Sequence, residues 1–150
     1  MKTTYKKIMN DLMPALTQVT EMQARGMLIL PAKIGYALGR NISMANPFLK
    51  DYEKERQAIL EKCVKHDAAG KLATFVNENK EKKWDFKEGG EVMYKEMMEK
   101  FLDTEITWSA YRMPKDVLEQ VDNFPVQAYG VLEEFEMITD LHLSMAKLPN

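Results

Sequence analysis

The first part of the chain carries apolar residues at every third or fourth position from Thr3 to Arg25. This spacing places them on one face of an amphipathic helix. Pro14 interrupts the pattern, and because a proline inside a helix removes a backbone hydrogen bond, we expect a kink there or a break near Met13. Gly26 is expected to follow the helix cap and end the helix.

A second helical pattern begins at Pro31, which suits the first turn of a helix because its missing N–H would have no partner there. An apolar stripe then continues to His66, with charged residues on the other side. Asn46 and Pro47 lie within this stretch. They either cap and start a separate helix or kink one long helix that runs to His66.

After Gly70 the spacing changes to that of strands. Residues 72–76 (LATFV) are rich in strand formers, and residues 83–87 alternate between apolar and charged side chains. The five residues between them, NENKE with Lys82 following, predict a hairpin over 72–86. A further alternating stretch predicts a strand over 104–111, with Ile106, Trp108 and Ala110 on one face and Glu105, Thr107, Ser109 and Tyr111 on the other.

Three further helices are expected, one after Gly89-Gly90, a short one from Pro114 to Val121, and a last one from Pro125. The residues expected on their apolar faces are Val92, Met93, Met97, Met98, Phe101 and Leu102 in the first helix and Val126, Tyr129, Leu132, Phe135 and Ile138 in the last.

This order of elements predicts an α+β fold, a helix-rich single domain over residues 1–150 with a small antiparallel sheet. The length of 150 residues fits one domain. A single cysteine excludes a disulfide framework. Because the chain also lacks a long apolar run and a signal-peptide pattern, we expect a cytoplasmic protein that does not enter membranes.

No known catalytic or metal-binding motif occurs in the sequence. Cys63 and His66 could share a helix face, but two ligands do not make a zinc site, and a buried thiol beside a helix-end histidine is the simpler interpretation. The net charge of −2 lacks the overall basic excess of a general nucleic-acid binder, although a local patch remains open. We therefore expect no enzymatic activity, no cofactor and no metal.

The most unusual segment is LPAKIGYALGRN, which begins at Leu30. On a helix Lys33, Tyr36 and Arg40 point the same way. Gly35 and Gly39 leave room for close approach, so two cations beside an aromatic ring could hold an anionic nucleotide-type ligand. The alternative is that the glycines allow tight helix packing while both cations are solvated.

Three weaker candidates exist. Lys87 with Gly89-Gly90 opens a helix, where free N–H groups attract anions, although a simple turn explains the glycines as well. Aromatic residues and arginine on the expected strands are typical of interface cores, although the simpler interpretation packs Trp108 in the core and leaves Tyr111 and Arg112 exposed. An acidic run is usually a solvated helix face, and it could also mimic phosphate charge. The aromatic and arginine set consists of Trp84, Trp108, Tyr111 and Arg112. The acidic run consists of Glu133, Glu134, Glu136 and Asp140.

The order LPAKIGYALGRN, YEKERQAILEKCVKHDAAGK, a Met/Phe-containing helix ending in TEITW, and VLEEFEMI resembles a family of short proteins of unknown function from tailed phages and prophages of Gram-positive bacteria. The resemblance covers residues 27–138 and rests on helical patterning. It implies a small cytoplasmic protein of phage origin and supplies no catalytic residues.

Under this resemblance three functions compete. The first is counter-defence by sequestering an anionic nucleotide-derived signal, with Lys33, Tyr36 and Arg40 as ligand-binding residues. The second is inhibition of a host defence protein, such as a nucleic-acid-guided nuclease, in the manner of an anti-CRISPR protein. The third is an accessory role in virion assembly. Because twelve methionines and several apolar helix faces exceed what one small core hides, we also expect a homo-oligomer.

Overall fold

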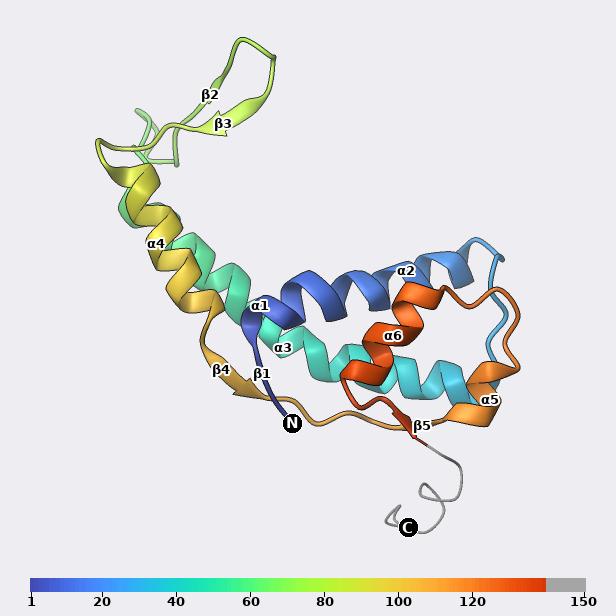
Figure 1. The fold of residues 1–150 in the computed structure, drawn as a ribbon. Helices are drawn as coiled ribbons and strands as arrows, with labels where there is room; N and C mark the ends of the chain where they lie inside the picture. The colour runs from blue at the N-terminus through green and yellow to red at the C-terminus, as the bar shows by residue number, and fades with distance from the viewer. Residues whose placement is uncertain (140–150) are drawn as a thin grey trace. The chain divides into compact units, whose positions relative to one another are not determined.

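The computed structural model describes residues 1–139, which divide into two compact units (Figure 1). The first unit is Met1–Leu49 together with the described chain from Glu105 onward, and the second is Lys50–Thr104. The fold is α+β, rich in helix with small two-stranded sheets, which confirms the predicted class. The single domain stays a prediction.

The first unit begins with strand β1 (Lys2–Thr4) and not with helix, so the predicted start at Thr3 was wrong. Helix α1 (Tyr5–Lys7), a π-helical segment η1 (Ile8–Leu12) and helix α2 (Met13–Ala24) then follow without a gap. The Met13 N–H donates to the Ile8 carbonyl, five residues earlier. The wider π-helical turn thus lies directly before Pro14, and the helix is not broken at Met13.

Gly26 ends α2 as predicted. Its φ of +72° lies in the left-handed region, which glycine adopts without strain. The Gly26 N–H donates to the Gln23 carbonyl at 3.1 Å, and the Met27 N–H donates to the Met22 carbonyl at 2.9 Å. This pair of bonds is the Schellman motif, which satisfies carbonyls that the helix end would otherwise leave free.

Helix α3 (Ala32–Cys63) is one long helix with Pro47 inside it. Of the two alternatives for Asn46-Pro47, the structure therefore has one long helix, which ends at Cys63 and not at His66 as expected. The first turn begins after Pro31, whose carbonyl accepts hydrogen bonds from the N–H groups of Ile34 and Gly35, each at 3.0 Å. Pro31 thus precedes the helix and accepts its first bonds.

The rest of the first unit consists of short elements around the N-terminal part of α3. Strand β4 (Glu105–Thr107) pairs antiparallel with β1, and strand β5 (Met113–Pro114) pairs parallel with β6 (Ile138–Thr139). Helices α5 (Lys115–Glu119) and α6 (Val126–Glu134) lie between β5 and β6. The last helix ends earlier than predicted, because Glu136 has a φ of +59° and the chain turns there into β6.

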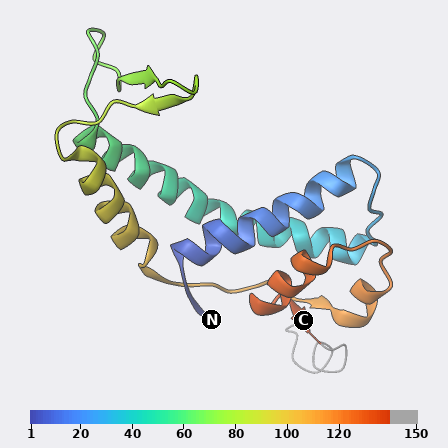
Figure 2. The same ribbon diagram turned by 45° about the horizontal axis from the view of Figure 1, so that its top comes forward.

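The core of the first unit forms where α2, α3, α6 and η1 meet (Figure 2). Trp108 is 1% exposed, and its Nε1–H donates to the Phe135 carbonyl at 3.0 Å. The predicted alternation after Thr104 is confirmed, since Ile106, Trp108 and Ala110 face inward. Val126 is 84% exposed, so its predicted place on the apolar face of the last helix was wrong.

The second unit contains the C-terminal part of α3, a hairpin and helix α4 (Gly90–Leu102). The predicted hairpin is confirmed, with β2 (Thr74–Val76) and β3 (Lys82–Trp84) antiparallel around the loop 77–81. Its sheet is separate from that of β4, so the predicted strands do not join one sheet. On α4, Met98 packs with Ile59 and Cys63, whereas Val92 and Met93 are exposed, contrary to prediction.

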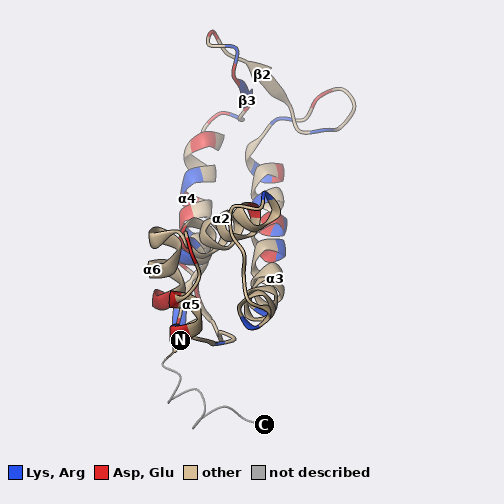
Figure 3. Ribbon diagram, turned by 90° about the vertical axis from the view of Figure 1, so that its right-hand side faces the viewer, with Lys and Arg blue, Asp and Glu red and all other residues tan. Residues whose placement is uncertain are grey.

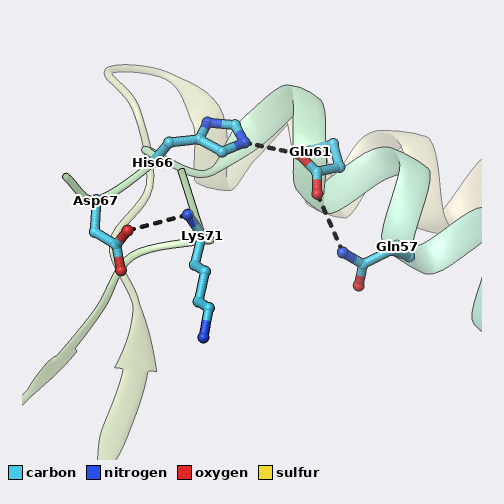
Figure 4. Close-up of polar contacts among 5 residues, drawn as sticks. All are labelled: Gln57, Glu61, His66, Asp67 and Lys71. Carbon is cyan, nitrogen blue, oxygen red and sulfur yellow. Dashed lines mark hydrogen bonds and ion pairs between the residues drawn. The ribbon is translucent and has the colours of Figure 1, made fainter. Parts of the chain in front are cut away.

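A polar cluster joins the last turns of α3 to the segment that follows (Figure 4). His66 Nε2 lies 2.7 Å from Glu61 Oε2, and Gln57 Nε2 donates to Glu61 Oε1 at 3.2 Å. Next to it, Asp67 Oδ1 accepts the Lys71 N–H at 3.0 Å and closes the following turn. The hydrogen bond with His66 is the main reason why the pKa of Glu61 lies below its ordinary value of 4.5.

This lowered pKa predicts acid-sensitive stabilisation. Because the folded state holds Glu61 ionised, its contribution is fully present above pH 4.5 and is lost as the pH falls through the folded-state pKa. Glu61→Gln should therefore lower the melting temperature at neutral pH, with the difference from wild type shrinking as the pH drops below 4.5. Glu55→Gln, an exposed change on the same helix, is the control. A Glu61→Gln difference that is constant with pH would contradict the assignment.

Candidate functional site

The predicted ligand-binding residues lie on the exposed face of the first turns of α3. Lys33 and Arg40 are exposed, and Tyr36 is 58% exposed. Neither cation forms an ion pair with any other residue in the described part of the chain. The helix therefore brings the three side chains to one surface, with two positive charges that no acidic side chain of residues 1–139 pairs with.

Gly39 is exposed and Gly35 is half-buried. A Cβ atom built at either position would meet nothing within 4 Å. The interpretation that these glycines allow tight packing against another helix therefore finds no neighbour in the described residues. Since glycine in a helix interior costs up to about 1 kcal/mol relative to alanine, the chain carries a destabilising pair at this surface.

Tyr111 completes the surface. Its ring centroid lies 5.5 Å from that of Tyr36 with an interplanar angle of 79°, an edge-to-face pair. The Arg40 guanidinium carbon lies 5.7 Å from the centre of the Tyr111 ring, within the range of a cation–π contact. We call these side chains the α3 aromatic–cationic surface, with Lys33, Tyr36, Arg40 and Tyr111 as its members.

The buried side chain of Asn41 fixes the position of Tyr111 through hydrogen bonds to its backbone. It is fully buried, and its Nδ2 donates to the carbonyls of Ala37 and Tyr111, each at 2.8 Å. Its Oδ1 accepts the Tyr111 N–H at 2.9 Å. The side-chain amide thus pairs with both polar groups of the Tyr111 backbone and fixes the loop against α3.

Sequence reasoning missed this role of Asn41 and assigned Tyr111 to a different set. Trp108 belongs to no surface, because it is 1% exposed and lies in the core of the first unit. The outward position of Tyr111 was visible in the alternation after Thr104. Its contact with α3 spans 70 positions, however, and no local pattern signals it.

The surface is suited to anions that carry an aromatic group. A guanidinium and an ammonium supply donors for phosphate or carboxylate oxygens. The exposed Tyr36 ring offers a face for stacking. A cavity of about 430 Å³ also borders Pro31, but no lysine or arginine lines it. The anion-binding chemistry of this region therefore belongs to the exposed helix face.

The weaker candidates have local partners. At the Gly89-Gly90 turn, the Gly90 N–H donates to the Lys87 carbonyl at 2.7 Å, so it is not free for an anion. Glu134 pairs with Lys7 at 3.1 Å, and Glu136 lies 4.0 Å from Arg112. Asp140, the last member of the acidic run, lies outside the described residues.

Cys63 is buried and His66 contacts Glu61. No group of three or more histidine, cysteine or acidic side chains in residues 1–139 is placed to hold a metal ion. In the same residues, no helix has both the length and the apolar character that crossing a membrane requires. Comparisons with protein-family models, curated proteins and solved structures found no match to this chain.

Proposed function

We propose that the protein is a non-enzymatic binding protein that sequesters an anionic, nucleotide-derived ligand on the α3 aromatic–cationic surface. The observation that carries this proposal is the combination of Lys33 and Arg40, two cations without an ion pair among residues 1–139, with an exposed Tyr36–Tyr111 ring pair. If Lys33 and Arg40 were only solvated surface residues, no aromatic side chain would be needed beside them. Here the guanidinium contacts one of the two rings, and the rings contact each other.

In this proposal the ligand phosphates lie against Lys33 and Arg40, and the base stacks on Tyr36. Gly39, one turn beyond Tyr36, lets the ligand approach the helix backbone without meeting a Cβ. Charge-assisted hydrogen bonds contribute about 1.5–3 kcal/mol each.

The biological role that fits such a site is counter-defence in the host cytoplasm. A protein without a catalytic centre lowers the free concentration of a signalling nucleotide simply by binding it. The resemblance to phage proteins supports this role. A second copy of the chain, as expected for a homo-oligomer, would enclose the open surface and double its positive charge, which favours a multiply charged ligand.

Two other functions have less support. Inhibition of a host defence nuclease through acidic mimicry relies on Glu133, Glu134 and Glu136, two of which have basic partners that reduce their net charge. A virion assembly role relies on exposed apolar side chains such as Ile29, which is 86% exposed. Neither function explains why two cations and Tyr36 on α3 meet Tyr111 of the loop after β4.

The test is a thermal-shift screen against nucleotides and cyclic nucleotides, followed by titration calorimetry. A ligand at 100 times its Kd adds about 2.7 kcal/mol of stability. Arg40→Ala should weaken binding at least about tenfold, since one charge-assisted hydrogen bond is lost. Lys33→Ala should act similarly, and Tyr36→Ala should cost less and only for ligands with a base. Lys62→Ala, an exposed change at the far end of the same helix, is the control.

Gly39→Ala is expected to change ligand affinity and folding stability in opposite directions, so it tests binding separately from folding. Because a Cβ at this position meets nothing, the change should raise stability by about 0.5–1 kcal/mol. The same Cβ stands where the ligand approaches, so affinity should fall. Unchanged affinity in Arg40→Ala and Lys33→Ala, or no stabilisation by any nucleotide, would overturn the proposal.

A further inference from the structure

The connection between α2 and α3 carries an exposed apolar segment, residues 27–30, that the proposed function does not use. Its side chains alternate between outside and inside. Met27 and Ile29 are 57% and 86% exposed, whereas Leu28 is buried and Leu30 packs against the core of the first unit. This alternation has the period of a strand. The two leucines therefore hold the 27–30 segment to the core, and Ile29 stands out from it.

The backbone of the 27–30 segment has free hydrogen-bonding groups. The Met27 N–H caps α2, but Leu28, Ile29 and Leu30 neither donate nor accept a backbone hydrogen bond with any other of residues 1–139. A strand with unpaired N–H and C=O groups is a template to which a second chain can add a strand. Pro31, which has no N–H, follows the segment and keeps such pairing short.

A cavity of about 430 Å³ adjoins the 27–30 segment. It is lined by Met27, Ile29 and Pro31 on one side and by residues 120–123 on the other. This volume is larger than an isoleucine side chain, and Val121 adds a further apolar wall. One patch of the first unit thus combines a protruding isoleucine with a hollow that can take such a side chain.

Opposite charges flank the same patch. Figure 3 views this end of the first unit, and the connection from α2 to α3 carries no charged position between Arg25 and Lys33. Arg25 directly precedes the connection, Asp122 borders the cavity, and both are exposed. Neither forms an ion pair with another residue in the described part of the chain. An identical patch facing this one would supply a counter-charge to each.

From this arrangement we infer that the 27–30 segment pairs antiparallel with the same segment of a second copy of this chain. A twofold axis then passes near Ile29, because a side chain on the rim of its own cavity reaches the partner's cavity only close to the axis. Arg25 faces the partner's Asp122. An unrelated extended peptide would have to supply both the apolar side chain and the counter-charge, which this chain already carries.

Sedimentation equilibrium measures this pairing. Wild type should show a monomer–dimer equilibrium, and Ile29→Asp should raise the dissociation constant of the dimer at least about tenfold, since two carboxylates would meet in a buried apolar contact. Because Ile29 is 86% exposed, the change leaves the fold of the monomer intact, which circular dichroism checks. Val126→Asp is the matched control, because Val126 is 84% exposed and does not line the cavity. It should dimerise like wild type.

Two further measurements locate the contact. Cys63, the single cysteine of the sequence, is buried, so Ile29→Cys introduces an accessible thiol. In air this variant should form a disulfide-linked dimer, because the axis brings the two thiols together, whereas Val126→Cys should stay unlinked. Hydrogen exchange reports the backbone pairing. The amides of residues 28–30 should be protected in the dimer and exchange freely in Ile29→Asp.

Charge reversal tests the contact between Arg25 and the partner's Asp122. Arg25→Glu and Asp122→Arg should each weaken the dimer about two- to fivefold, the size expected for an exposed ion pair. The double variant restores opposite charges and should recover the affinity of wild type. Arg40→Ala changes the α3 aromatic–cationic surface and should dimerise like wild type.

Several outcomes would overturn the inference. They are a monomer up to high micromolar concentration, a dimer of Ile29→Asp as stable as that of wild type, and a dimer without protection of the amides of residues 28–30. Equal cross-linking of Ile29→Cys and Val126→Cys, or a double charge reversal no better than the single changes, would also overturn it. The inference does not depend on ligand binding at α3, so a monomeric protein that binds nucleotides would refute only the dimer.

Discussion

Gly90→Ala is expected to destabilise the second unit by about 3 kcal/mol, near the upper end of the cost of overfilling a packed site. A Cβ at Gly90 would lie 2.2 Å from the Cys63 carbonyl oxygen and 3.4 Å from the Phe86 Cβ. The clash is with backbone, so no side-chain rotation relieves it. The first turn of α4 would have to move away from the end of α3.

The same movement would break a second contact. The Cys63 carbonyl also accepts the Lys87 N–H at 2.9 Å, which holds the chain before α4. Urea unfolding followed by circular dichroism measures the change in the free energy of unfolding. Gly130→Ala in α6 is the matched control, because a Cβ there meets nothing, and it should be neutral or stabilising by up to about 1 kcal/mol. Equal effects of the two changes would contradict the close-approach argument.

The Gly90 contact illustrates what the sequence could not show. Gly89-Gly90 predicts a turn and a helix start, and both occur, with Gly89 at a φ of +71°. That the second glycine is required by the end of another helix depends on a contact 27 positions away. The helix end at Gly26 and the hairpin loop could be predicted from the sequence because they depend on neighbouring residues only.

Long-range pairing accounts for most of what was missed in the fold. Strand β1 has no alternating pattern of its own and forms because β4 supplies its hydrogen bonds from more than 100 positions away. Val92 and Met93 fit the helical spacing of α4, yet the described part of the second unit has no element that covers them. Helical periodicity alone does not say which apolar positions find a partner.

Only part of the candidate site could be predicted from the sequence, for the same reason. Lys33, Tyr36 and Arg40 share a face through helix geometry, so their spacing was enough to group them. Tyr111 reaches the same surface only because the chain after β4 passes along α3. The residue that ties the two segments together, Asn41, looks in the sequence like an ordinary polar position of an amphipathic helix.

Asn41→Ala is therefore expected to cost about 2–4 kcal/mol in the free energy of unfolding, since it removes three hydrogen bonds from a fully buried amide and leaves the Tyr111 N–H and carbonyl without these partners. The released Tyr111 would no longer hold its ring against Tyr36 and Arg40, so ligand affinity should fall together with stability. Chemical denaturation and calorimetry on the same variant measure both quantities.

The control for Asn41→Ala is Asn46→Ala, the same change at an exposed position of the same helix, which should stay within about 0.5 kcal/mol of wild type. Asn41→Asp sharpens the test, because its second oxygen would face the Ala37 and Tyr111 carbonyls in place of a donor. Burial of that carboxyl would favour its neutral form, so the loss of stability should be larger at neutral than at acidic pH. A loss no larger than that of Asn46→Ala would mean that Asn41 does not hold the surface together.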